Sequence, residues 1–446
     1  MKVLSRYSSK HQLPDYDCME LSRRVTTYAQ GLPLALKILG SFLFGMERHE
    51  WKSYLEKLKD TPNPKINQVL RLSYDELDHK VKDMFLDIVC FFKGEDKDYD
   101  PGKWSRLWSH EDVSHVLKKN TGTEEVEGIF LDLSNLQEIH FTSKGFERMN
   151  KLRLLKVYKS HICKDSKCSF KTEQCEVHFS QNFKFHSDDL RSLYWHGYSL
   201  KSLPHDFNPE NLVELSMPYN HIKRLWKGLK VLEKLKFLEL SHSDCLMEIP
   251  DLATASNLER LVLEGCTKLS SVHPSLSVLK KLVFLSFRGC IKLRDFPKSI
   301  ELESLQILIL SGCSKLKKFP EIKGYMKHLS ELFLDGTAIE ELPSSIEYAT
   351  GLVILDLTNC KMLRSLPNGI CNLESLETLL LSDCSKLGSL PQNFGKLKRL
   401  RKLYADRIPI RALPTSFADL RNLQVLSFHG CKGLNSLISS CLLCQL

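Results

Sequence analysis

Cysteine and histidine are two residue types that can bind a metal ion, and they can also act as a nucleophile or a base. The sequence has 15 cysteines and 16 histidines. Cys163, Cys168, Cys175 and His178 stand close together and could be drawn as a zinc site. Their spacing, however, is not the paired CxxC arrangement that structural zinc sites use. We therefore expect no metal at these residues.

Six other cysteines recur at one position of a sequence repeat: Cys266, Cys290, Cys313, Cys360, Cys384 and Cys431. At such a position a thiol serves as a small buried hydrophobic group and as a weak hydrogen-bond donor to the backbone of a loop. We predict that these six thiols are structural, which suits a protein that works inside the cell.

The histidines do not form a catalytic arrangement with other residues. His196, His221 and His242 fall near the ends of expected strands, without a serine, cysteine or aspartate at a fixed spacing, so we interpret them as loop residues rather than as general bases. The GxxxxGK[ST] motif, whose backbone and lysine hold the phosphates of a nucleotide, does not occur in the sequence. We predict that the chain is not an enzyme.

A leucine repeat determines the elements that would position these residues. Its clearest unit runs from Leu305 to Pro320, in the pattern LxxLxLxxC followed later by an apolar residue and proline. Residues equivalent to Pro320 recur every 22 to 24 residues, at Pro204, Trp226, Pro250, His273, Pro297, Pro343, Pro367, Pro391 and Pro414. Such regularity is the signature of leucine-rich repeats.

This pattern predicts an α/β fold, a leucine-rich-repeat solenoid with parallel strands on its concave face. In each LxxLxL segment the leucines point into the core, while the x positions of the short strand point outward. Proline turns the chain on the convex side, because it cannot extend a ladder of strands. A solenoid of this kind offers a long binding surface rather than a catalytic pocket.

Three regions are expected along the chain. Residues 1–95 carry apolar residues at helical spacing and predict a small helical domain, and residues 96–150 are expected to be a connector that caps the first repeat. The solenoid is expected to cover residues 151–440, with a polar insertion near 160–189. No polar cap is evident after Leu437, so we expect the chain to be shortened at this end.

Composition and charge narrow the possible partners. The net charge of +9 is spread over the chain, with acidic residues between the basic ones, whereas a nucleic-acid surface needs denser basic clusters interleaved with aromatic residues. The sequence contains no signal peptide, no apolar run of about 18 residues and no Asn-x-Ser/Thr glycosylation acceptor. We therefore expect protein partners, no nucleic acid, no membrane insertion, and a location in the cytoplasm or the nucleus.

Several motifs resemble those of plant disease resistance proteins of the TIR-NB-LRR class. Residues 31–36, GLPLAL, resemble the GLPL motif of the nucleotide-binding domain of that class, the NB-ARC domain. Residues 72–77, LSYDEL, and 85–92, FLDIVCFF, resemble a later helical motif of the subclass with a TIR domain. The resemblance extends to the connector and first repeats of that subclass, at residues 101–108, 122–133 and 193–198.

The resemblance implies an intracellular immune receptor whose repeats recognise pathogen effectors, guarded host proteins or another receptor of the class. Complete members exchange ADP for ATP in the NB-ARC domain and signal through an N-terminal TIR domain that consumes NAD. Here no TIR domain precedes residue 1, and the winged-helix segment is largely missing between Phe92 and Pro101. Pro33 matches the proline that contacts adenine in the class, but we expect no bound cofactor, because phosphate contacts supply most of the affinity.

We interpret the chain as a shortened member of this class, a remnant of the NB-ARC domain followed by a nearly complete set of repeats. The leading hypothesis is non-enzymatic recognition of proteins by the concave face. An ADP/ATP-dependent switch is the alternative, and an extracellular receptor domain is a third hypothesis. The candidate contacts are the outward positions Lys236, Phe237, Glu239, Glu259, Arg260, Phe284, Ile307, Ile309, Phe333, Asp356, Arg401, Lys402 and Tyr404.

Overall fold

The computed structural model describes residues 50–51, 100–135, 138–159, 176–179, 183–185 and 187–434 of the 446-residue chain. The chain divides into two units, Met1–Asp98 and Tyr99–Leu446. In the first unit only Glu50 and Trp51 are described. The helical domain expected over residues 1–95, with Pro33, therefore lies outside the described residues.

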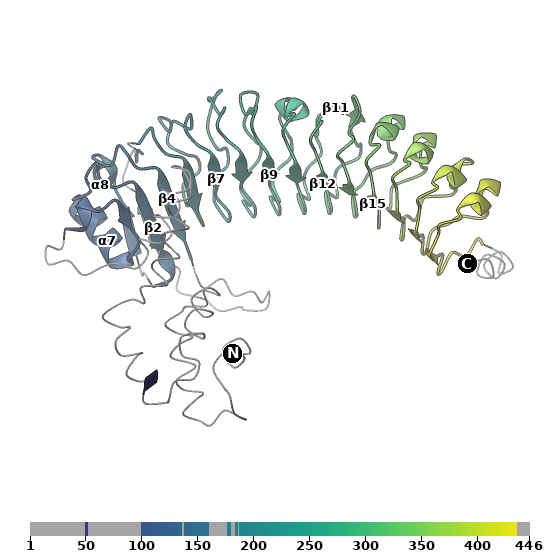
Figure 1. The fold of residues 1–446 in the computed structure, drawn as a ribbon, viewed down its shortest axis with the longest axis horizontal. Coiled ribbons are helices and arrows are strands. Elements are labelled where there is room, and N and C mark those ends of the chain that lie inside the picture. The colour runs from purple at the N-terminus through teal and green to yellow at the C-terminus, as the bar shows by residue number, and fades with distance from the viewer. Residues whose placement is uncertain are drawn as a thin grey trace. The chain divides into compact units, whose positions relative to one another are not determined.

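The second unit is a curved solenoid whose strands line the inner side of an arc (Figure 1). In its described part, 14 strands form one parallel sheet and follow one another in chain order. They are β1 (Arg106–Leu107), β2 (Gly128–Asp132), β4 (Leu154–Tyr158), β6 (Ser192–Trp195), β7 (Glu214–Ser216), β8 (Phe237–Glu239), β9 (Arg260–Val262), β10 (Phe284–Ser286), β12 (Ile307–Ile309), β14 (Glu331–Phe333), β15 (Ile354–Asp356), β16 (Thr378–Leu380), β17 (Lys402–Tyr404) and β18 (Val425–Ser427). The predicted leucine-rich-repeat solenoid is therefore confirmed.

Leucine side chains explain why each strand forms at its place. The middle leucine of one strand lies beside the middle leucine of the next, as in the register of Leu285, Leu308 and Leu332 on β10, β12 and β14. All three are fully buried, and complete burial of a leucine side chain contributes about 2 kcal/mol. Because a single turn cannot bury its leucines alone, the turns are stable only as a stack.

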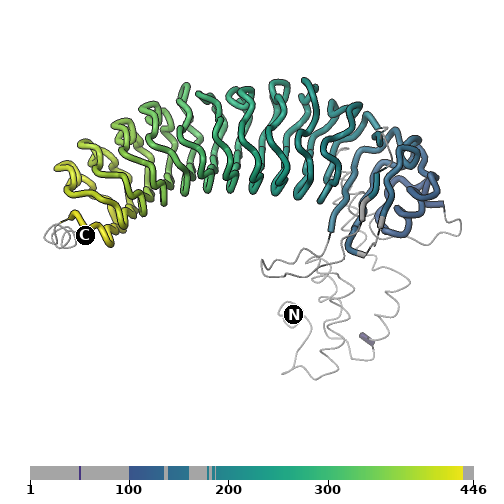
Figure 2. The backbone as a smooth tube through the Cα atoms, turned by 180° about the vertical axis from the view of Figure 1, so that it is seen from behind, coloured from purple at the N-terminus to yellow at the C-terminus, as the bar shows by residue number. Residues whose placement is uncertain are grey.

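Loops and short 3-10 helices return the chain along the outer side of the arc, and the successive turns can be followed in Figure 2. The helices are η4 (Pro274–Val278), η5 (Ser344–Tyr348), η6 (Asn368–Asn372), η7 (Phe394–Lys396) and η8 (Thr415–Asp419), and β11 (Ser299–Ile300) pairs with β13 (Glu321–Ile322) on the same side. Pro343, Pro367 and Pro414 occupy the N-caps of η5, η6 and η8. The fixed φ of proline suits this turn, where the missing N–H leaves no strand unpaired.

The sheet begins earlier than the leucine pattern predicts. The sequence places the first repeat at residue 151, but within the expected connector β1 already pairs with β2, and β2 pairs with β4. The reason is that Ile129 and Leu131 alternate as in the later strands and are buried. The connector also contains η2 (Pro101–Lys103), α7 (His110–Lys119), η3 (Leu133–Asn135) and α8 (Ser143–Phe146). Ser109 caps α7 by accepting a hydrogen bond from the N–H of Glu111.

The described end of the expected polar insertion contributes to the hydrophobic core. β5 (Glu176–Phe179) pairs with β3 (Glu138–Phe141) in a separate parallel sheet. The ring centroids of Phe179 and Phe183 are 5.1 Å apart, and those of Phe179 and Trp195 are 5.5 Å apart. This aromatic cluster attaches the insertion to the first turns, through phenylalanines that stand among polar residues in the sequence.

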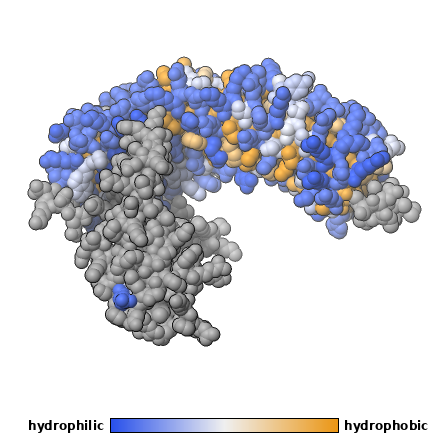
Figure 3. All heavy atoms as spheres, in the orientation of Figure 1, coloured by the Kyte–Doolittle hydropathy of each residue, from blue (hydrophilic) through white to orange (hydrophobic). Residues whose placement is uncertain are grey.

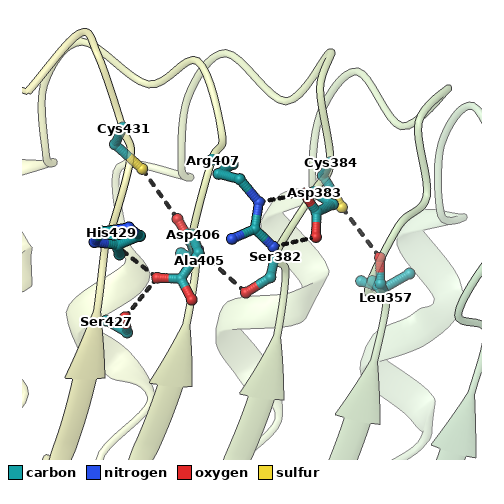
Figure 4. Close-up of polar contacts among 10 residues, drawn as sticks. All are labelled: Leu357, Ser382, Asp383, Cys384, Ala405, Asp406, Arg407, Ser427, His429 and Cys431. Atoms are coloured by element: carbon teal, nitrogen blue, oxygen red, sulfur yellow. Dashed lines mark hydrogen bonds and ion pairs between the residues drawn. The ribbon is translucent and has the colours of Figure 1, made fainter.

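The six recurring cysteines connect successive turns. Each thiol donates to the backbone carbonyl that follows the strand of the preceding turn: the Sγ of Cys313 lies 3.2 Å from the carbonyl oxygen of Phe287, and that of Cys384 lies 3.1 Å from the oxygen of Leu357 (Figure 4). Asn220 takes this position in an earlier turn and donates to the hydroxyl of Ser243. The structural role predicted for the thiols is therefore confirmed.

We predict that Cys313, Cys360 and Cys384 do not react with iodoacetamide at pH 8 in the native chain. Burial raises the pKa of these thiols to about 12, 11 and 12, so about one in 10³ or fewer is present as the reactive thiolate. Timed labelling followed by peptide mass spectrometry measures this, with the half-buried Cys245 as a comparison. Rapid labelling of the three thiols before unfolding would contradict their place in the core.

Candidate recognition surface

The inner side of the arc presents aligned rows of side chains. In β8 the first residue, Phe237, is exposed, the middle residue, Leu238, is buried, and the third residue, Glu239, is half-buried. Because the strands are in register, the first residues align across the sheet and so do the third residues. We call these two rows, together with the residue two positions beyond each third residue, the inner face.

The structure brings the predicted contact residues to one side of the solenoid. Ten of them stand in the two rows of the inner face: Phe237, Arg260, Phe284, Ile307 and Lys402 as first residues, and Glu239, Ile309, Phe333, Asp356 and Tyr404 as third residues. The other three, Lys236, Glu259 and Arg401, immediately precede β8, β9 and β17. These three therefore stand at the edge of the inner face.

Ion pairs neutralise the residues at this edge. The Nζ of Lys236 lies 2.8 Å from Oε1 of Glu259, and the Nη1 of Arg401 lies 3.4 Å from Oε2 of Glu377. All four side chains are at least one third exposed, so each pair contributes about 1 kcal/mol or less. The charges at this edge already have partners within the chain.

Ile309 is one of the predicted contact residues, but the exposed fraction of its side chain is only 8%. Its neighbours in register are Ser286 on β10, which is also buried, and Phe333 on β14. The sheet is curved with this face inside (Figure 1), and curvature brings the side chains of adjacent strands closer together. Ile309 therefore supports its neighbours and offers almost no surface to a partner.

An apolar strip crosses the middle of the inner face. Phe237 is 37% exposed, and Phe284, Ile307 and Phe333 are half-buried. The guanidinium carbon of Arg260 lies 4.1 Å from the ring centroid of Phe284, a cation–π contact that orients both side chains. Figure 3 views the arc from its flank, with the inner face along the lower edge, and shows hydrophobic side chains among hydrophilic ones over the middle of the arc. Aromatic and arginine side chains in this arrangement are typical of protein-binding hot spots.

The inner face also contains four carboxylates that are absent from the predicted contact residues and that accept hydrogen bonds from serines: Glu214, Glu264, Asp335 and Asp406. Glu214 is the first residue of β7, and the other three lie two positions beyond the third residues of β9, β14 and β17. Glu264 and Asp335 each directly precede a glycine with positive φ. This position before the turn is the sequence signal that could have identified them.

Serine hydroxyls of adjacent turns hold these carboxylates. The Oγ of Ser192 donates to Oε2 of Glu214 over 3.0 Å, and the Oγ of Ser286 donates to Oε1 of Glu264 over 2.7 Å. The pairs Ser216–Glu239, Ser311–Asp335 and Ser427–Asp406 repeat this contact, the last of them in Figure 4. The hydroxyls orient the carboxylates without neutralising their charge.

Asp356 is a carboxylate whose position disfavours its negative charge. It accepts a hydrogen bond from the N–H of Thr358 over 2.8 Å, yet the pKa of Asp356 is raised, chiefly by burial and further by the charge of Asp335. Carboxyl groups with such perturbed pKa values occur preferentially at functional sites. Asp356 is thus the predicted contact residue that the structure sets apart most clearly on electrostatic grounds.

In each turn that follows a strand of the main sheet from β6 to β18, one residue just beyond the inner face has a positive φ. In four middle turns this residue is a glycine: Gly265, Gly289, Gly312 and Gly336. Tyr219 and His242, both with φ of 58°, take the position in earlier turns, at a cost of about 1 kcal/mol each relative to glycine. Their rings stack with centroids 4.6 Å apart. Together with His196, whose ring centroid lies 5.0 Å from that of Tyr219, they form an aromatic edge to the face.

The same column contains an ion pair near the C-terminal turns. Asp383 and Arg407 also have positive φ, and the Nε and Nη2 atoms of Arg407 each lie 2.6 Å from a carboxylate oxygen of Asp383 (Figure 4). The hydrogen bonds to Arg407 lower the pKa of Asp383. Unlike the serine-held carboxylates, Asp383 therefore has a cation as its partner.

The described residues contain no group of three or more histidine, cysteine, aspartate or glutamate side chains arranged to hold a metal ion. Cys163, Cys168 and Cys175 lie outside them, and the ring of His178 stacks on that of His140 with centroids 4.7 Å apart. Within the same part of the chain, no helix has the length and apolar character needed to cross a membrane.

The sequence of this chain is similar to known families and proteins. Residues 301–389 match a family described as disease resistance protein RPS4B-like, leucine-rich repeats, and residues 211–230 match a leucine-rich-repeat family. Disease resistance protein RPP2A of Arabidopsis thaliana is 38% identical over 391 residues, which cover 76% of this chain and 29% of that protein.

Two further relatives extend the match. Disease resistance protein RPV1 of Vitis rotundifolia is 38% identical over 62% of this chain and 24% of its own length. Disease resistance-like protein DSC1 of Arabidopsis thaliana is 35% identical over 84% of this chain and 35% of its own length. The chain thus spans between 24% and 35% of the length of these three relatives.

We predict that Asp356→Asn raises the free energy of unfolding at pH 7. Because the pKa of Asp356 is raised in the folded chain, its ionisation disfavours folding at neutral pH, whereas an amide keeps the acceptor for Thr358 without the charge. The difference in the free energy of unfolding between the variant and the native chain should vanish at acidic pH, where the carboxylate of Asp356 becomes protonated. Denaturant unfolding at pH 7 and at about pH 4 measures both values. A loss of stability at pH 7 would show that the charge itself stabilises the fold.

Proposed function

Because the chain is a homologue of plant disease resistance proteins and folds as a leucine-rich-repeat solenoid, we propose that it is the protein-recognition part of a plant immune receptor. The inner face is the binding surface in this proposal, and the chain itself catalyses no reaction. The observation that carries the proposal is the position of Phe237, Arg260, Phe284 and Phe333 on one continuous face, with the Arg260–Phe284 contact already formed.

The partner in this proposal is a protein, because a strip of aromatic side chains bordered by fixed charges suits the core and rim of a protein interface. It is a pathogen effector, a host protein that such effectors target, or another receptor of the same class. The cytoplasm or the nucleus is the proposed location. Of the thirteen contact residues predicted from the sequence, nine stand in the inner face, three stand at its edge, and Ile309 is left out because it is buried.

We predict that replacing Phe284 and Phe333 by alanine lowers the amount of partner captured from plant leaf extract by the full chain at least about tenfold. Tyr325→Ala is the matched control, because Tyr325 is 63% exposed and its ring lies 5.5 Å from that of Tyr348 in η5, on the outer side. Quantitative mass spectrometry of co-precipitated proteins compares the variants. Equal capture by the inner-face variant and the control variant would remove the inner face as the binding surface.

A nucleotide-dependent switch makes a different prediction for the same chain. Since the sequence contains no GxxxxGK[ST] motif, the phosphates of ADP lack their backbone cradle and lysine. We predict that isothermal titration of the full chain with ADP in the presence of Mg²⁺ gives no heat of binding at micromolar concentrations. Binding in that range would support the switch, and recognition would then be only part of the function.

A further inference from the structure

We propose that the inner face binds a protein segment that is basic at two places and apolar between them; this inference rests on the recognition function proposed above. The face carries two groups of negative charge separated by the apolar strip. Glu214, Glu239 and Glu264 form the first group on β7, β8 and β9 and the turn that follows, and Asp335 and Asp356 form the second on β14 and β15.

The first observation behind this inference concerns the partners of the carboxylates. Those at the edge of the inner face are paired with cations, whereas, among the residues that the structure describes, those of the two groups are not. Glu259 and Glu377, at the edge of the inner face, each form an ion pair with a lysine or arginine. Within the described part of the chain, the five carboxylates of the two groups form no ion pair; each accepts a hydrogen bond from a serine hydroxyl or from the backbone instead. Their charge is therefore available to a partner.

The second observation is the apolar strip between the two groups. Phe284 and Ile307 stand on β10 and β12 there, and Phe237 and Phe333 stand on β8 and β14 at its two ends. The charged residues that face the same region are Arg260, Arg288 and Glu331. Arg260 lies over the ring of Phe284, and Arg288 is exposed two positions beyond β10. The strip thus provides an apolar centre, with the acidic groups on both sides of it along the arc.

The order of the strands determines the distance between the two groups. Glu239 belongs to β8 and Asp335 to the turn after β14, and β9, β10 and β12 lie between these strands. Three strand spacings of about 4.8 Å separate the turns of Glu264 and Asp335 by about 14 Å, and four spacings separate the strands of Glu239 and Asp335 by about 19 Å. A helical partner covers the longer distance in about 13 residues, so its basic side chains are expected at two sites about 13 residues apart.

Charge complementarity selects a basic partner over an acidic one. A neutral or acidic surface that covered the two groups would remove water from half-buried carboxylates without replacing it by cations, which is unfavourable. Lysine and arginine side chains at the same places would compensate the charges and direct the partner to this part of the face. Nucleic acid, with its phosphate backbone, would be repelled by both groups.

The test uses the full chain and two synthetic helical peptides of equal length, each with the same apolar residues between two charged sites about 13 residues apart. One peptide carries paired lysines at these sites, and the other carries paired glutamates. Fluorescence anisotropy at low salt should show binding of the lysine peptide at least about tenfold tighter than that of the glutamate peptide. The net charge of +9 of the chain favours the opposite order, so this preference would report the inner face.

The decisive variant combines Glu239→Gln, Glu264→Gln, Asp335→Asn and Asp356→Asn. The amides keep an acceptor for the serine hydroxyls and for the Thr358 N–H, so the fold is retained while four charges are removed, and a thermal melt checks this. The variant should lose the preference for the lysine peptide. Glu303→Gln, which removes a carboxylate paired with Lys280 at 2.8 Å outside the inner face, should keep it.

Two outcomes overturn the inference: no preference of the native chain for the lysine peptide, or a preference that the four-amide variant retains. These outcomes are separate from a failure of the recognition function. If Phe284→Ala with Phe333→Ala lowers partner capture while the four amides do not, the inner face is the recognition surface and its charges are irrelevant. If neither change lowers partner capture, both proposals are wrong.

Discussion

The contact between equivalent leucines of successive turns is the interaction on which the rest of this structure depends. Leu285, Leu308 and Leu332 illustrate it, since they lie side by side on neighbouring strands and are fully buried. The thiol of Cys313 adds a hydrogen bond from one turn to the backbone of the preceding one. Because every turn repeats these contacts, the spacing and register of the strands follow, and with them the positions of the side chains on the inner face.

This division of roles leaves the inner face open to variation. Leucine and cysteine positions supply the stability, so the residues between them can contain features that cost stability locally. Tyr219 and His242 have positive φ where four middle turns use glycine, and Asp356 keeps a carboxylate where burial raises its pKa. Neither feature is needed to stack the turns. Their presence on or beside one face agrees with a surface that is shaped by what it binds.

The fold could be predicted largely from the sequence, because each LxxLxL segment and each recurring cysteine acts within its own turn or on the next. The early strands β1 and β2 lie before the predicted repeats, since Gly128–Asp132 lacks the following proline. The serine–carboxylate pairs, such as Ser286 with Glu264, and the burial of Ile309 depend on register between turns and on curvature. A pattern within one turn cannot show either of these, so the charge distribution of the inner face required the structure.

Hydrogen–deuterium exchange of the full chain, alone and with a protein partner captured from plant tissue, tests the central claim most directly. If the inner face is the recognition surface, partner binding should slow exchange in the segments that contain β8 to β15 and the turns that follow these strands, and should leave η4 to η8 on the outer side unchanged. Slower exchange confined to the outer helices would contradict the account.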